Sequence, residues 1–176
     1  MAFMAKQRAQ AHYNAGSLIL LDKSPSPKAL RKAIKHLQKA TKLDPSFAFA
    51  FHNLAHAWYM VSEGTIIAAR RSDLQIEAYN EKERCKDHSD VEDFITSVLE
   101  CALNAVDQAL TISYEFPQAH NTRAMILAKL GRLDEAIEAT EVALSQDPDY
   151  KNASENREKI KELRRNASKF WKALIR

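Results

Sequence analysis

The residues of this sequence that could do chemistry are few, and they point to binding. His52 and His56 stand four residues apart in the segment HNLAH, a spacing that can place two imidazoles on one metal ion. No glutamate lies between them as in zinc proteases, and no third ligand is evident, so we expect no metal and no other cofactor. No Ser/His/Asp, Cys/His or paired-carboxylate arrangement stands out, which predicts that the protein is not an enzyme.

The composition describes an ordinary helical chain. Only 3 of the 176 residues are Gly and 5 are Pro, which argues against an all-β fold and against Gly-rich phosphate loops. Cys85 and Cys101 are too few for a disulfide framework. There is no apolar run of membrane-spanning length and no apolar block near the first residues. We therefore expect an intracellular, cytoplasmic protein.

Charge is unevenly distributed along the chain. Residues 1–45 carry nine Lys/Arg against two Asp, which gives +7, and residues 151–176 carry nine against three Glu, which gives +6. The middle, residues 46–150, carries eight basic against eighteen acidic residues, which gives −10. Basic ends of this kind are typical of proteins that bind nucleic acid or anionic membranes, which is our alternative hypothesis for the function. Charge complementarity within or between chains explains the same pattern.

Small residues recur at helical spacing through the sequence. Gly16, Ala55 and Ala124 occupy matching places in three segments, and each is followed three positions later by a large residue. A second stripe, of small residues seven apart, follows each of them: Ala33 and Ala40, Ala102 and Ala109, Ala136 and Ala143. Small residues let two antiparallel helices approach closely, and helix pairs that cannot bury their own apolar faces must stack.

These motifs resemble the tetratricopeptide repeat family. Phe51, Leu54, Ala55 and Trp58 match its first helix, and the segment from Gly131 to Ala136 matches its turn and second helix. The resemblance implies an all-α fold, an α–α superhelix of about eight antiparallel helices in one domain. We expect repeats at about 11–47, 48–116 and 117–150, with a helical insertion at about 62–96 and a C-terminal helix at about 151–175. The expected helices are 3–21, 27–43, 47–61, 65–86, 90–113, 117–130, 133–146 and 151–174.

The same resemblance implies a binding surface. In the family, the first helices of the repeats line a groove that holds peptides, so we expect an adaptor or scaffold that binds a segment of a partner protein. The matching residues are Tyr13, Asn14, Ser17, Phe49, His52, Asn53, His56, Gln118, Asn121, Thr122 and Met125. Their amides can bond a peptide backbone, and their aromatic and Met side chains supply apolar area. A solvated face, or a groove filled by the inserted helix or by the N-terminal segment, would explain these residues equally well.

One branch of the family binds the C-terminal carboxylates of the Hsp70 and Hsp90 chaperones through a clamp of Lys, Asn and Arg. The matching positions here are Tyr13, Ser17, Asn53, Gln118 and Thr122, and only Asn53 is retained. Without the cations the carboxylates have no charge-assisted partners. We therefore expect no such clamp.

The C-terminal segment is basic and amphipathic. Its apolar residues recur at spacings of three and four, which predicts a helix that caps the last repeat. Its last residues extend past one hairpin length, so Phe170, Trp171 and Leu174 are candidates for docking onto a partner or a second copy of the chain. Ser89 and Glu92 form a predicted capping box before the helix at 90–113.

Overall fold

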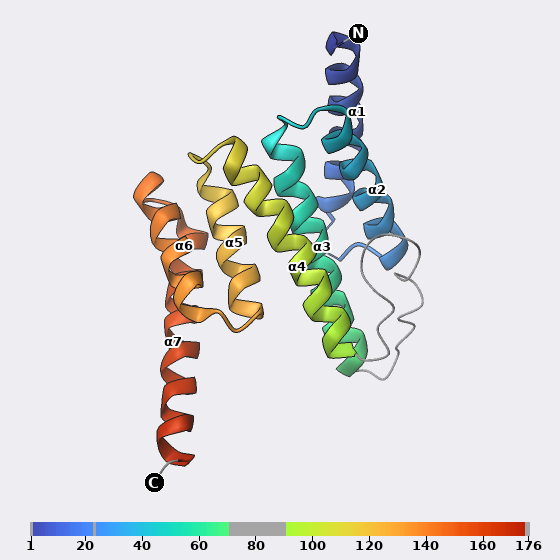
Figure 1. Ribbon diagram of the computed structural model, residues 1–176. Helices are drawn as coiled ribbons and strands as arrows, with labels where there is room; N and C mark the ends of the chain where they lie inside the picture. The colour runs from blue at the N-terminus through green and yellow to red at the C-terminus, as the bar shows by residue number, and fades with distance from the viewer. Residues whose placement is uncertain (1, 23, 71–90, 175–176) are drawn as a thin grey trace. The chain divides into compact units, whose positions relative to one another are not determined.

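Within the residues that it describes, the computed structural model is built of α-helices and the turns between them. It describes residues 2–22, 24–70 and 91–174, without the side chains of residues 2, 65–70, 91 and 168–174. Within these ranges there are seven helices (Figure 1): α1 Ala2–Leu20, α2 Pro27–Leu43, α3 Ala48–Arg70, α4 Val91–Ile112, α5 Pro117–Lys129, α6 Leu133–Gln146 and α7 Lys151–Leu174. Their bounds agree with six of the predicted helices to within one residue at each end.

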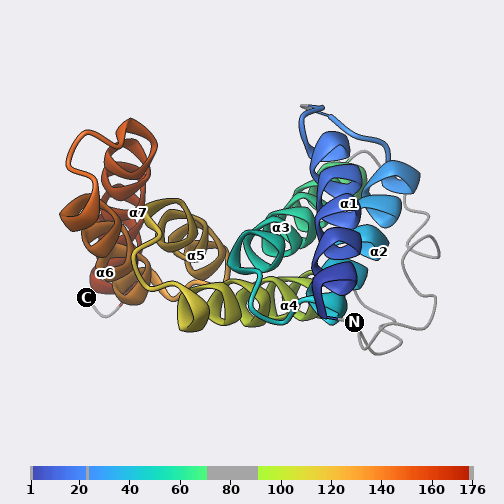
Figure 2. The ribbon, with the colours of Figure 1, turned by 90° about the horizontal axis from the view of Figure 1, so that it is seen from above.

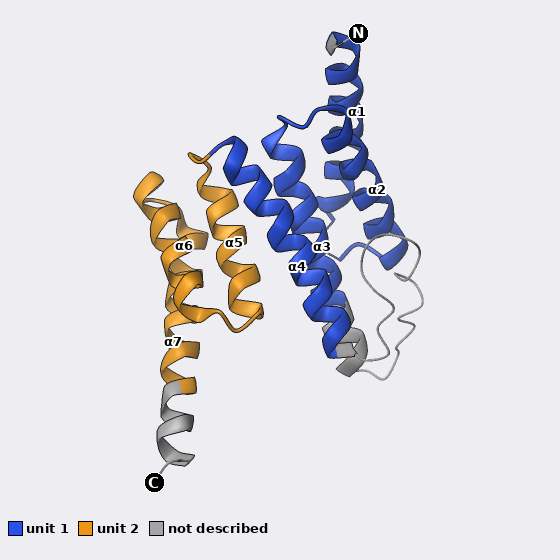
Figure 3. Cartoon of the chain, viewed as in Figure 1, with its two compact units in different colours: residues 1–113 blue, residues 114–176 orange. Residues whose placement is uncertain are grey.

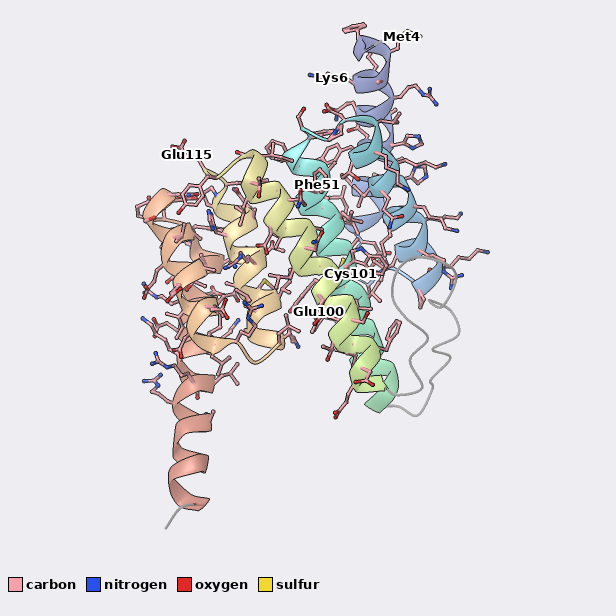
Figure 4. The ribbon with its side chains drawn as sticks, viewed as in Figure 1. Met4, Lys6, Phe51, Glu100, Cys101 and Glu115 are labelled. Atoms are coloured by element: carbon pink, nitrogen blue, oxygen red, sulfur yellow. The ribbon has the colours of Figure 1, made fainter. Side chains whose placement is uncertain are left out.

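The chain divides into two compact units, residues 1–113 and 114–176 (Figure 3). In the first unit α1 pairs with α2 and α3 with α4, and α3 also contacts α2 and α1, as the view from above shows (Figure 2). In the second unit α5 pairs with α6, and α7 packs against α6 and α5. Each unit is therefore a stack of antiparallel helices whose neighbours along the chain are neighbours in space.

The predicted small residues lie where the helices come closest. Ala33, Ala40, Ala55, Ala102, Ala109, Ala124, Ala136 and Ala143 are all completely buried. Gly16 shows why size matters, because a Cβ added there would stand 2.7 Å from Leu37 Cγ and 3.2 Å from the Ala33 carbonyl oxygen. Larger residues on the second helix of a pair, such as Leu37 on α2 and Val106 on α4, are also fully buried. This confirms that small side chains in phase allow the helices to pack.

Two helix ends show how the local sequence sets the boundaries. Ser26 caps α2, since its Oγ accepts a hydrogen bond from the Ala29 N–H over 3.2 Å, and Pro27 occupies the first turn. Gly131 ends the α5 segment with φ 76°, a left-handed conformation that glycine adopts without a Cβ clash. The Arg132 N–H then reaches back to the Leu127 carbonyl over 2.9 Å.

The sequence predicted two helices, 47–61 and 65–86, with a break between them. This break is wrong, because a single helix extends through it as far as residue 70. The helix α3 continues without interruption through Ser62, Glu63 and Gly64. Val61 and Ser62 are completely buried, and this packing outweighs the cost of about 1 kcal/mol for one glycine in a helix. The remainder of that predicted helix, including Cys85, and the capping residue Ser89 lie outside the described residues.

The capping role of the C-terminal helix is confirmed. Ala153 and Ile160 on α7 are buried within the second unit, whereas residues 162–167 are exposed. In Figure 1, α7 extends beyond the ends of α5 and α6. Its first half therefore covers the apolar side of α5 and α6, and the helix then projects from them. In the described part of the chain, no helix has the length and apolar character needed to cross a membrane.

Candidate functional site

The predicted binding residues of the first unit gather on a face shared by α1 and α3. Asn53 Nδ2 on α3 donates a hydrogen bond of 2.8 Å to Ser17 Oγ on α1. Tyr13 lies one turn before Ser17 on α1, and its ring centroid is 4.8 Å from that of Phe47, just before α3, with an angle of 45° between the rings. These two contacts join α1 and the start of α3 directly, while both helices also pack against α2. We call this surface, with Tyr13, Asn14, Ser17, Phe49, His52, Asn53 and His56, the α1–α3 face.

Several groups of the α1–α3 face remain accessible. Phe49 is 55% exposed, which is unusual for a residue of its size. Asn14 is exposed too, and its Oδ1 accepts a 2.8 Å hydrogen bond from Gln10 Nε2. Tyr13, Ser17, His52, Asn53 and His56 are half-buried. The face thus combines an exposed aromatic ring with partly used amides.

Burial controls the charge of one imidazole on this face, that of His56. The pKa of His56 lies below its ordinary value of 6.5 because burial penalises the charged ring. His56 is therefore neutral at pH 7 and can both donate and accept hydrogen bonds. A neutral imidazole suits a peptide amide better than a carboxylate.

The predicted residues of the second unit offer less surface. Gln118 on α5 is exposed and Met125 is half-buried, but Asn121 and Thr122 are only 5% and 9% exposed. Asn121 Oδ1 accepts a 3.0 Å hydrogen bond from Asn156 Nδ2 on α7, and its own Nδ2 lies 3.9 Å from Met125 Sδ. The amide of Asn121 therefore holds α7 against α5 and has little area left for a ligand.

Two residues that contact the predicted binding residues, Asn156 and Phe47, were not identified from the sequence. Asn156 follows Asn121 by 35 residues, much as Asn53 follows Ser17 by 36, so both pairs join helices one repeat apart. Continuing the repeat spacing into the capping helix would have found Asn156. Phe47, which lies just before α3, belongs to no repeat motif and left no such signal.

A second pair of histidines lies between α1 and α2. The Nδ1 atoms of His12 and His36 are 3.0 Å apart and share a hydrogen bond, and the ring centroids are 5.3 Å apart. The pKa of His12 is lowered, chiefly because burial penalises its charged form. Repulsion from His36, Lys39 and Arg8 lowers it further. Among the described side chains, no three His, Cys, Asp or Glu residues are grouped so as to hold a metal ion.

Comparison with known proteins identifies the repeat. Residues 117–150, which span α5, α6 and the turns around them, match the family model of the tetratricopeptide repeat. These residues form a tetratricopeptide repeat. No curated protein matches the chain as a whole.

Solved structures show that the tetratricopeptide fold extends over most of the chain. The tetratricopeptide domain of Arabidopsis OM64 is 16% identical, with a TM-score of 0.64 over 90% of this chain and 98% of that one. The first such domain of human RPAP3 is 15% identical, with a TM-score of 0.64 over 89% and 92%. The second RPAP3 domain, solved with the HSP70 peptide SGPTIEEVD, is 17% identical, with a TM-score of 0.62 over 92% and 98%. At these identities the likeness establishes the fold, an α–α superhelix.

Proposed function

We propose that this protein is an interaction module that holds an extended or helical segment of a partner protein on the α1–α3 face, as an adaptor or scaffold and without catalysing a reaction. Tetratricopeptide domains are protein-interaction modules, and some similar structures contain peptides of partner proteins. The observation that carries the proposal is the Ser17–Asn53 hydrogen bond, which joins the two first helices into one surface beside the exposed ring of Phe49.

The chemistry of the α1–α3 face suits an uncharged stretch of peptide. After its bond to Ser17, the Asn53 amide retains its carbonyl oxygen and a second N–H, a pair that matches one peptide group. Phe49 supplies an apolar platform for a side chain of the partner, and aromatic residues dominate the energy of such contacts. The bound segment is therefore expected to carry an apolar anchor next to backbone groups that bond Asn53.

This proposal can be tested with peptides selected from a random displayed library on the full chain. The enriched peptides are synthesised and titrated by fluorescence anisotropy. We expect Phe49→Ala to weaken binding about tenfold or more, and Asn53→Ala about fivefold, because each removes one anchor of the bound segment.

The matched control is Asn104→Ala, the same type of change at an exposed position of α4. It should leave the affinity as it is. Thermal denaturation of each variant verifies that unit 1 remains folded. Enriched peptides that bind wild type, Phe49→Ala and Asn53→Ala equally well would show that the α1–α3 face is not the binding surface.

The proposal also excludes one class of peptide. Of the positions that match the carboxylate clamp, Tyr13 packs against Phe47 and Ser17 is hydrogen-bonded to Asn53, and none of them carries a cation. We expect the peptides SRMEEVD and SGPTIEEVD, which occupy two of the similar structures, to bind no better than scrambled sequences. Micromolar binding of either peptide in the same assay would refute the absence of a clamp.

A further inference from the structure

The outer face of α2 carries a row of lysines. Lys28, Lys32, Lys35, Lys39 and Lys42 follow one another at alternating spacings of four and three, and all five are exposed. At 100° per residue they lie within an arc of roughly 80°, and they span about 21 Å of the helix. The buried residues of α2, among them Leu30, Ile34 and Leu37, lie on the opposite side. We call these five residues the lysine stripe.

Among the residues that the structure describes, no carboxylate forms an ion pair with the lysine stripe. The helix α2 itself contains no Asp or Glu. Like charges three or four residues apart on a helix repel each other and destabilise it. A row of negative charge at the same spacing would remove this repulsion.

The outer face of α6 carries such a row. Asp134, Glu138 and Glu141 are spaced by four and three residues, are exposed, and lie opposite the buried Ala136, Thr140 and Ala143. The helix α6 contains no Lys or Arg. Asp134 bonds Arg164 of α7 over 2.9 Å, but both side chains are more than half exposed, so this pair is weak and exchangeable. We call these three residues the acidic stripe.

We propose that the lysine stripe of one molecule docks on the acidic stripe of α6 in a second copy of the chain. Laid antiparallel, Lys32, Lys35 and Lys39 fall opposite Glu141, Glu138 and Asp134, because both helices space their charges by the same turns. The helix dipoles also favour the antiparallel arrangement. This inference goes beyond the α1–α3 face and does not depend on it.

Other occupants fit the lysine stripe less well. The helix α2 has no Phe, Tyr or Trp on which nucleic-acid bases could stack, and its one imidazole, His36, lies against His12. Its exposed face has no large apolar residue that could enter a membrane interface. A helix with carboxylates at the same spacings of three and four residues can pair with successive lysines, and the acidic stripe of this chain pairs with the three central ones.

The docking joins different surfaces of the two copies, so each copy retains one unused stripe. Such head-to-tail contacts extend into larger assemblies unless they close into a ring. The mass should therefore continue to rise with concentration. Because exposed ion pairs are weak and screened, association should occur at low salt and disappear at high salt.

Sedimentation equilibrium of the full chain tests the proposal. In about 20 mM salt the weight-average mass is expected to rise with concentration, and in about 0.5 M salt, where the Debye length is only about 4 Å, it should stay at the monomer value. The variant with Lys32→Glu, Lys35→Glu and Lys39→Glu should remain monomeric at low salt. The variant with Glu138→Lys and Glu141→Lys should remain monomeric as well. An equimolar mixture of the two variants should associate again, because each then offers the other an opposite charge.

A matched control changes the same net charge elsewhere. Lys151→Glu, Lys159→Glu and Lys161→Glu on α7 should leave association close to that of wild type, and circular dichroism verifies that all variants are folded. A wild-type mass that stays at the monomer value at low salt overturns the proposal. So does a mixture that fails to associate. Binding of wild type, but not of the α2 variant, to phosphatidylserine vesicles or RNA without self-association would assign the lysine stripe to that ligand instead.

Discussion

Gly16 and Gly64 both lie within helices, but Gly16 is closely packed and Gly64 has open space beside it. A Cβ at Gly16 would collide with Leu37, which is completely buried and has no room to move, whereas a Cβ at Gly64 would meet nothing within 4 Å. Both residues belong to the first unit. The pair therefore separates the effect of close helix packing from the intrinsic helix preference of alanine.

We expect Gly16→Ala to destabilise the first unit by about 1 kcal/mol, since overpacking outweighs the gain in helix propensity. Gly64→Ala should stabilise it by about 0.5–1 kcal/mol, because it gains the propensity at no steric cost. Urea denaturation monitored by circular dichroism measures both changes. Equal shifts of the same sign in the two variants would contradict the role of Gly16 in helix packing.

The histidines make stability depend on pH. Burial lowers the pKa of His12, His56 and His120 from the ordinary value of 6.5, although for His120 the hydrogen bond with the Tyr114 carbonyl acts in the opposite direction. Between the folded pKa values and 6.5 the unfolded chain binds more protons, so the free energy of unfolding falls as the pH falls. The stabilisation is complete above about pH 6.5 and decreases below it.

We expect the melting temperature to be lower at pH 5 than at pH 7.5, and His56→Gln to make this difference smaller. Differential scanning calorimetry at the two pH values measures it. His120→Gln serves as a second variant, in the other unit. A melting temperature that rises on acidification would mean that the folded state favours the charged imidazoles.

At the level of the elements, the first half of α7 covers the end of the second unit, and residues 162–167, which follow it, are exposed to solvent. Ile160 is 4% exposed and Leu163, one turn later, is 54% exposed. We expect Ile160→Ala to destabilise the second unit by about 2–4 kcal/mol, because it empties a site against its neighbouring helices. Leu163→Ala should cost less than about 0.5 kcal/mol, as is usual for exposed positions. Thermal denaturation compares the two, and equal losses would argue against the capping role.

Local chemistry explains which elements could be predicted from the sequence. The bounds of α2, α6 and α7 agree with the prediction, because Ser26 with Pro27, Gly131 and Pro148 each mark an end through the conformation of one residue. The continuation of α3 through Gly64 could not be predicted this way. It depends on the burial of Val61 and Ser62 in the packed unit, which no local pattern reveals.

The candidate site was predicted only in part, for a similar reason. Repeat spacing placed Ser17 and Asn53 on neighbouring helices, and the structure brings them to 2.8 Å. The same spacing predicted that Asn121 lies in the groove, but it did not identify Asn156, to which Asn121 is hydrogen-bonded. The capping helix, which contains Asn156, lacks the motif that marks the first helix of each repeat. The binding role of all these residues remains a prediction.

At the scale of the whole molecule, charge and apolar contact are placed on different surfaces. The α1–α3 face bears an exposed ring and amides, while the outer faces of α2 and α6 bear charges of one sign each. The lysines of α2 and the carboxylates of α6 are part of the uneven charge along the sequence. Substitutions on the α1–α3 face, which we propose for a partner segment, therefore leave the two charged stripes that we propose for a second copy unchanged.

The central claim is that a partner segment binds on the α1–α3 face. It is tested most directly by NMR titration of the ¹⁵N-labelled chain with a library-selected peptide at about 0.5 M salt, where the charged stripes are screened. We expect amide shift changes to concentrate in residues 10–21 and 47–63, and to vanish in Phe49→Ala at the same peptide concentration. Changes confined to α2, α6 or α7, with residues 10–21 and 47–63 unaffected, would contradict the claim.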